Sequence, residues 1–219
     1  MTTRRVLQSV LVATVIAVIG LVVWLVSSSD SPEPTRAASG ADAPAVVNDE
    51  THIVNQAQDE KAVLVEFLDF ECEACRAFYP AVEQLRATQG DELTLAIRYF
   101  PIPSHVNSTN AAVAVEAAAR QGQLEAMYQR MYETQAEWGE QGDSQADVFR
   151  GFAEDMHLDL EQYDDDVADP EVAARVQRDF DDGRALGVQG TPTFFLDGQR
   201  LEVSSPDELV QVVQEALAK

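Results

Sequence analysis

The stretch EFLDFECEACRAFYP, Glu66–Pro80, holds the only two cysteines of the chain, Cys72 and Cys75. It begins within an apolar run, AVLVEFLDF at 62–70, that has the length and composition of a buried central strand. From Cys72 onward the apolar residues recur at helical spacing to about Thr88. The two cysteines are therefore predicted to lie where a strand ends and a helix begins.

Two cysteines at Cys-X-X-Cys spacing have three interpretations. As a structural disulfide they would close a very short loop, which removes little entropy from the unfolded chain. As a zinc site they would supply two of four ligands, and His52, His105 and His157 lack the paired spacing that would complete it. As a redox pair they need no further residue, because a helix N-terminus stabilises a thiolate. We therefore expect redox chemistry without a metal ion, and histidines that lie at the surface or are satisfied by partners.

Position gives the residues of the motif separate roles. Cys72, at the helix start, is expected to be the exposed nucleophile, and Cys75, one turn further, the buried resolving thiol. Glu73 places a negative charge beside the thiolate and Ala74 supplies no cation. These two residues are expected to modulate the motif, and its oxidising strength stays open.

Glu66 is the one acidic residue inside the apolar part of the predicted strand. It shares a strand face with Leu64 and Leu68, so its carboxyl group is expected to be buried with a raised pKa. Such a group can accept or deliver the proton of Cys75, directly or through water. The alternative is an edge strand on which Glu66 faces solvent. The predicted catalytic residues are therefore Cys72, Cys75 and Glu66.

The rest of the folded part reads as a mixed α/β pattern. A second strand, LTLAIRYF, is expected at 93–100, and helix follows helix from about 107 to 186. The Met and aromatic stripes of these helices indicate core faces. The segment 193–203 predicts a hairpin around Asp197-Gly198, a pair that favours a type I′ turn. The tetrapeptide SPDE at 205–208 predicts a capping box at the start of a last helix.

The N-terminal part predicts a membrane anchor. Val6–Val26 is an uncharged apolar run of 21 residues, close to the roughly 20 that cross a bilayer as a helix. Arg4 and Arg5 precede the run and the next positive residue is Arg36, so the N-terminus is expected in the cytoplasm and the remainder outside. The alternative is a cleaved signal peptide, for which the best small-residue site, at 41–43, lies far from the run.

The chain thus divides into a cytoplasmic tail at 1–5, an anchor at 6–26, a linker at 27–47 and one folded domain at 48–219. The linker, which begins SSSDSPEPTRAASGADAP, has no helical or strand periodicity. The formal net charge of −23 argues against electrostatic binding of nucleic acid or anionic lipid, because such binding needs clustered Lys and Arg.

The stretch 66–80 resembles the active-site segment of the DsbA-like branch of the thioredoxin superfamily. In that superfamily a proline usually kinks the active-site helix where Pro80 falls, and a buried carboxylate usually stands at the position of Glu66. A second segment, GVQGTPT at 187–193, is similar to the loop that carries a cis-proline opposite the cysteines. The separation of 117 positions between Cys75 and Pro192 suits a helical domain inserted into the thioredoxin-like core.

The resemblance implies an α/β thioredoxin-like fold with an inserted helical domain. The one transmembrane helix predicted from the apolar run precedes this domain. The resemblance also implies a thiol-disulfide oxidoreductase that forms or exchanges disulfides in exported proteins, without a bound cofactor, and a membrane redox partner that regenerates its disulfide. Thr191 and Pro192 would bind substrate. Oxidising relatives have His before the second cysteine, where this chain has Ala74, so a reductase stays open, as does a peptide-binding chaperone or scaffold on the same fold.

Overall fold

The computed structural model describes residues 44–219. The predicted tail, the Val6–Val26 anchor and most of the 27–47 linker lie outside the described residues. Within 44–219, no helix combines the length and the apolar character that a membrane crossing requires. Two residues of the predicted linker contact the domain: Val46 packs against a core cluster, and the Ala45 carbonyl accepts a hydrogen bond from Arg98 Nη1 at 3.2 Å.

The described residues build a five-stranded sheet in the order β1-β3-β2-β4-β5. The central strands β2 and β3 are parallel, and the other pairs are antiparallel. The strands are β1 His52–Asn55, β2 Ala62–Leu68, β3 Leu93–Tyr99, β4 Thr193–Leu196 and β5 Gln199–Arg200. Nearly every residue of β2 and β3 is buried, as expected for parallel strands that are covered on both faces. The short edge strand β1 is an element that the sequence did not predict.

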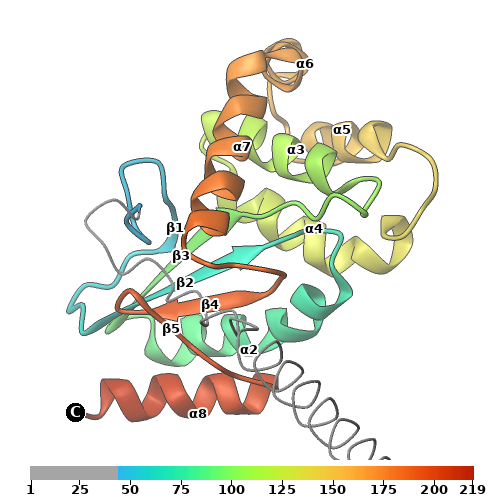
Figure 1. Ribbon diagram of the computed structural model, residues 1–219. Helices are drawn as coiled ribbons and strands as arrows, with labels where there is room; N and C mark the ends of the chain where they lie inside the picture. Colours follow the sequence, from blue (N-terminus) through green and yellow to red (C-terminus); the bar gives the residue numbers. More distant parts are fainter. Residues whose placement is uncertain (1–43) are drawn as a thin grey trace, which may run out of the picture. The chain divides into compact units, whose positions relative to one another are not determined.

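Seven helices cover the sheet in the described part of the chain (Figure 1). They are α2 Glu73–Gln89, α3 Ser108–Arg120, α4 Leu124–Trp138, α5 Ala146–Asp155, α6 Leu160–Ala168, α7 Pro170–Ala185 and α8 Pro206–Leu217. In Figure 1, α2 and α8 lie below the sheet and α7 lies above it, with α3 to α6 gathered beside α7. The predicted order of strand, helix, strand, helical block, hairpin and helix is confirmed.

Alternation along β2 distributes its side chains between two cores. Leu64 and Leu68 belong to the larger cluster, which includes residues of α2 and α8. Val65 and Phe67 belong to a smaller cluster, against which Phe180 of α7 packs. Since neighbouring strand residues face opposite sides, Glu66 points to the side of α2.

Turn and capping residues in the sequence determine where several strands and helices begin or end. Asp197 and Gly198 both have positive φ, 49° and 75°, as a type I′ turn requires. Asp169 caps α7 by accepting a hydrogen bond from Glu171 N at 2.9 Å. At the start of α8, Ser205 Oγ accepts from Glu208 N at 3.2 Å. The return bond of the predicted capping box differs, because the Glu208 carboxylate accepts from Ser204 N instead of Ser205 N.

Candidate active site

Both cysteines lie at the N-terminus of α2, as the sequence predicted. Cys72 is the N-cap residue, with extended backbone angles, and its thiol is half-buried. Cys75 lies one turn inside the helix and is fully buried. Both are free thiols in this structure. The more accessible sulfur therefore belongs to the residue whose position also favours a thiolate.

The loop before β4 brings the second predicted segment against the first. The Thr191-Pro192 peptide bond is cis. Cys72 Sγ donates a hydrogen bond to the Thr191 carbonyl oxygen at 3.4 Å, across 119 positions of sequence. The resemblance placed these two segments opposite each other, and the fold does bring Cys72, Thr191 and Pro192 together.

The pKa of Cys72 is lowered to about 6. The main cause is a hydrogen bond from the Cys75 thiol, and burial opposes it by raising the pKa. Smaller lowering contributions come from the Thr191 side chain and from the backbone N–H groups of Cys75 and Ala74. Near neutral pH, Cys72 is therefore largely a thiolate, the reactive form in disulfide exchange.

Cys75 and Glu66 shift in the opposite direction from Cys72. Burial raises the pKa of the Cys75 thiol well above its usual range, and the hydrogen bond to Cys72 adds to this. Burial also raises the pKa of Glu66 to about 8, with a further contribution from the negative charge of Cys72. Glu66 lies on β2 between β3 and β4, so the alternative of a solvent-facing edge position is wrong.

Side chains from the helical block hold the loop between β2 and α2. Gln135 of α4 donates from Nε2 to the carbonyl oxygens of Phe70 and Cys72, at 2.6 and 3.0 Å. The buried Glu71 carboxylate accepts hydrogen bonds from Asn107 N at 2.6 Å and from Glu140 N at 3.1 Å. The inserted helices thereby fix the position of the nucleophile.

Asn107 ties the same region together from the start of α3. It is fully buried, and its side chain accepts from Gln145 N at 2.8 Å and donates to the Gln141 and Asp143 carbonyls. The sequence did not indicate a role for Asn107, Gln135 or Glu71. The one local signal was the pair of acids, Asp69 and Glu71, that flank Phe70 just before the motif. Their partners lie 36 positions further along the chain, too far for sequence spacing to predict the contacts.

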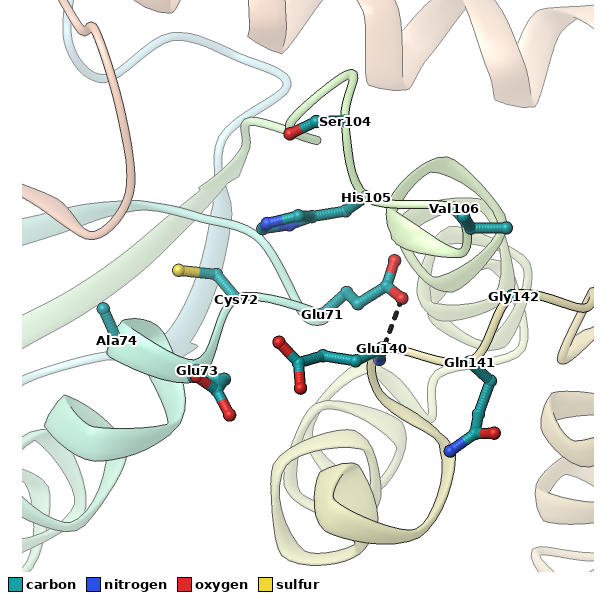
Figure 2. Close-up of a pocket in the computed structure, with 10 residues that line it drawn as sticks. All are labelled: Glu71, Cys72, Glu73, Ala74, Ser104, His105, Val106, Glu140, Gln141 and Gly142. Carbon is teal, nitrogen blue, oxygen red and sulfur yellow. Dashed lines mark hydrogen bonds between the residues drawn. The ribbon is translucent and has the colours of Figure 1, made fainter.

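A cavity of about 440 Å³ lies beside Cys72 (Figure 2). Glu73 and Ala74 line it from the first turn of α2, and both are exposed. His105 lines it from the segment between β3 and α3, and Glu140 from the segment after α4. The cavity is thus bounded by the predicted motif on one side and by the insertion on the other.

The three histidines differ in their surroundings. His105 Nδ1 lies 2.7 Å from Asp69 Oδ2, and His52 Nε2 lies 2.5 Å from Glu116 Oε2. Both are paired, as predicted. His157 follows α5 with a positive φ of 58°. Among residues 44–219, no group of three His, Cys, Asp or Glu side chains is arranged to hold a metal ion.

A reactive thiol above a buried partner thiol, facing a cis-proline loop on a mixed sheet, is the arrangement of a thiol-disulfide exchange protein. The family model described as thioredoxin matches residues 48–215, and the chain belongs to that family. Solved structures of a thioredoxin-like oxidoreductase, of BdbD and of DsbA share its fold.

Three solved structures illustrate this likeness. A thioredoxin-like oxidoreductase from Silicibacter pomeroyi DSS-3 is 25% identical, with a TM-score of 0.64 over 78% of this chain and 95% of that one. BdbD from Bacillus subtilis, in its oxidised form, is 17% identical, with a TM-score of 0.69 over 81% and 98%. DsbA from Xylella fastidiosa is 16% identical, with a TM-score of 0.61 over 77% and 90%. The last two show the fold alone, whereas the first, a thioredoxin-like oxidoreductase, agrees with the family match as well.

Curated relatives of similar sequence are much longer proteins. One named Na(+)/H(+) antiporter NhaA, from Herminiimonas arsenicoxydans, is 33% identical over 222 residues, which is 97% of this chain and 33% of that protein. NhaA 1 from Mycobacterium sp. (strain KMS) is 36% identical over 147 residues, or 65% and 23%. The chain spans a third or less of these relatives, so their names describe proteins of which only a part resembles this domain.

Proposed function

We propose that this chain is an extracytoplasmic thiol-disulfide oxidoreductase that forms or exchanges disulfides in exported proteins through Cys72 and Cys75. The observation that carries the proposal is the pairing of a half-exposed thiol of pKa about 6 with a buried thiol one helical turn away. A low nucleophile pKa stabilises the reduced form of the pair and so makes its disulfide a better oxidant. This supports the oxidising direction over the dedicated reductase.

The exchange proceeds in two displacement steps. A substrate thiolate attacks the Cys72 sulfur of the Cys72–Cys75 disulfide; the bond between the two cysteines breaks, Cys75 leaves as a thiolate, and a mixed disulfide forms. A second substrate thiolate then attacks the substrate sulfur of that mixed disulfide, and Cys72 leaves as a thiolate. The substrate has gained a disulfide, and the protein holds two reduced cysteines.

Glu66 supplies the proton that the first leaving group needs. Cys75 is buried with a raised pKa, so its thiolate is unstable and requires prompt protonation. The Glu66 carboxyl, with a pKa of about 8, still holds its proton at neutral pH. It can deliver this proton to Cys75 directly or through water.

Thr191 and Pro192 form the side of the site opposite the helix, and we assign them to substrate binding. Both are half-buried, and the Thr191 carbonyl contacts Cys72 Sγ. An extended substrate segment that places its cysteine on Cys72 must pass this loop. The same contact would serve a peptide-binding chaperone, for which the cysteines would be dispensable.

The N-terminal sequence supports the cellular setting of this proposal. The Val6–Val26 run would hold the domain at the outer face of the cell membrane as a single-pass anchor, with residues 1–5 in the cytoplasm. Disulfides persist in that compartment. A membrane redox partner would take up the two electrons and restore the Cys72–Cys75 disulfide.

The test is an equilibrium of the full chain, in detergent, with mixtures of reduced and oxidised glutathione. A single two-electron transition that requires both cysteines, at a potential above that of the glutathione pool, supports an oxidising exchange protein. A chain that stays reduced across the whole range of mixtures would instead favour the alternative function of a dedicated reductase. Undiminished peptide binding in a variant lacking both cysteines, without any exchange by the wild type, would favour the chaperone.

A further inference from the structure

His105 is held in a fixed orientation at the wall of the active-site cavity. Its Nδ1 lies 2.7 Å from Asp69 Oδ2, and its side chain is 32% exposed, whereas that of Asp69 is 0% exposed. Asp69 also accepts hydrogen bonds from Glu71 N at 2.8 Å and Ile102 N at 2.9 Å. A carboxylate with two amide donors accepts from the ring, so Nδ1 carries a proton and Nε2 is the nitrogen available for chemistry.

The available face of this ring belongs to the same cavity as Cys72. Figure 2 shows the His105 imidazole and the Cys72 thiol on adjoining walls, with the ring extended toward the side on which Cys72 lies. No hydrogen bond joins Nε2 to another of the described residues. A substrate sulfur that enters the cavity to reach Cys72 therefore meets His105 as well.

The motif itself lacks a positive charge, and His105 is placed where it can supply one. The residue before Cys75 is Ala74, and the other charged groups at the cavity wall are carboxylates. Among the described residues that line the cavity, His105 alone can become a cation. An opposite charge close to a thiolate favours the thiolate.

We propose that His105 is a catalytic residue of this disulfide exchange and that Asp69 is its positioning residue. The proposal rests on the exchange function proposed above. Nε2 of the neutral ring takes the proton of the incoming substrate thiol, and the substrate sulfur attacks Cys72. The Cys72–Cys75 bond breaks, and the electron pair of that bond leaves on Cys75. The imidazolium that results then stabilises Cys72 when this residue departs as a thiolate in the second displacement.

The charges that face His105 come from three elements. Asp69 and Glu71 follow β2, Cys72 and Glu73 begin α2, and Glu140 follows α4. Glu71 is committed to two backbone amides, and Glu73 is exposed and therefore screened by solvent. Of these groups, Asp69 is the one that contacts the His105 ring.

The test compares His105→Asn with a matched control, His52→Asn, in the full chain. Asparagine can keep a donor on Asp69 but has no group that titrates in place of Nε2. His52 also pairs with a carboxylate, Glu116, but does not line the cavity. We expect His105→Asn to move the thiolate titration of Cys72 upward by about one pH unit. It should also slow exchange with a thiol peptide roughly tenfold at pH 7, while His52→Asn matches the wild type.

An unchanged Cys72 titration and an unchanged pH–rate profile in His105→Asn would overturn the proposal. If that variant melts early, Cys72→Ala provides a second test without altering the histidine. Because the coupling is reciprocal, the NMR signals of the His105 ring should then titrate over a lower pH range; no movement would also overturn the proposal. A wild-type chain that exchanges no disulfide would refute the proposed function. The thiolate titration of Cys72 would still test whether His105 acts on that thiol, because it does not require exchange activity.

Discussion

Two buried sites with ionisable side chains lie on opposite faces of the same sheet, and their surroundings differ. On the α7 face, Arg98 of β3 is 0% exposed and its Nε lies 2.6 Å from Asp179 Oδ1, while its Nη2 lies 2.6 Å from Asp182 Oδ2. On the α2 face, the buried Glu66 is influenced mainly by desolvation and by the Cys72 charge, neither of which favours its ionised form. A paired charge holds elements together, whereas an unpaired acid keeps a proton that it can transfer.

Replacing the unpaired acid should increase stability, and the gain should depend on pH. The pKa of Glu66 is about 8 in the folded protein and about 4.3 in the unfolded chain. Between these values the folded state binds more protons, so the unfolding free energy of the wild type falls as pH rises through this window. Glu66→Gln should therefore match the wild type at pH 4 and exceed it by at most about 5 kcal/mol at pH 9.

Urea unfolding at several pH values measures this difference. Glu133→Gln, at an exposed position of α4, is the control and should change stability little at any pH. A Glu66→Gln gain that is equal at pH 4 and pH 9 would show that Glu66 is not held protonated in the folded protein.

Removing the cation from the paired site should have the opposite effect. Arg98→Leu removes one of the two arginines that pair with the buried Asp179, the other being Arg175 at 2.7 Å. The cost should therefore stay below the about 3–5 kcal/mol expected for a buried charge left wholly unpaired. The pair joins α7 to β3, so we expect the unfolding free energy to fall near neutral pH. The thiolate titration of Cys72 should be unchanged. A loss below about 1 kcal/mol would contradict the structural role of the pair.

Adding a cation beside the thiolate should change reactivity more than stability. Ala74→His places a positive charge at the exposed position before Cys75 and should lower the pKa of Cys72 further below about 6. Glu73→Gln should act in the same direction but more weakly, since solvent screens that side chain. Thiolate absorbance against pH measures both variants. If Glu73→Gln had the larger effect, the Glu73 carboxylate would not be screened by solvent as its exposure indicates.

Much of the site could be predicted because its signals are local. The cysteine spacing, the apolar neighbours of Glu66 and the Thr191-Pro192 segment each lie within a few residues of the feature that they indicate. The strand order, with β1 at the edge, could not be predicted in this way. His52–Asn55 is four residues long, and its pairing with β3 depends on the tertiary fold.

The contacts that position the nucleophile could not be predicted for a related reason. Gln135 reaches Phe70 across 65 positions, and Asp69 reaches His105 across 36. Each is an ordinary polar residue of a helix or loop until the insertion folds against the motif. Sequence periodicity reports which face of a helix is buried, but it does not report which backbone carbonyl a buried amide will meet.

The central claim is that Cys72 is the residue that forms mixed disulfides with substrates and that Cys75 is the buried partner that can release them. It is tested most directly by trapping mixed disulfides in intact cells. Cys75→Ser keeps the accessible nucleophile and removes the thiol that releases its substrate, so it should accumulate mixed disulfides with exported proteins. Cys72→Ser leaves only a buried thiol of raised pKa and should accumulate far fewer. Equal trapping by the two variants, or trapping mainly by Cys72→Ser, would contradict the account.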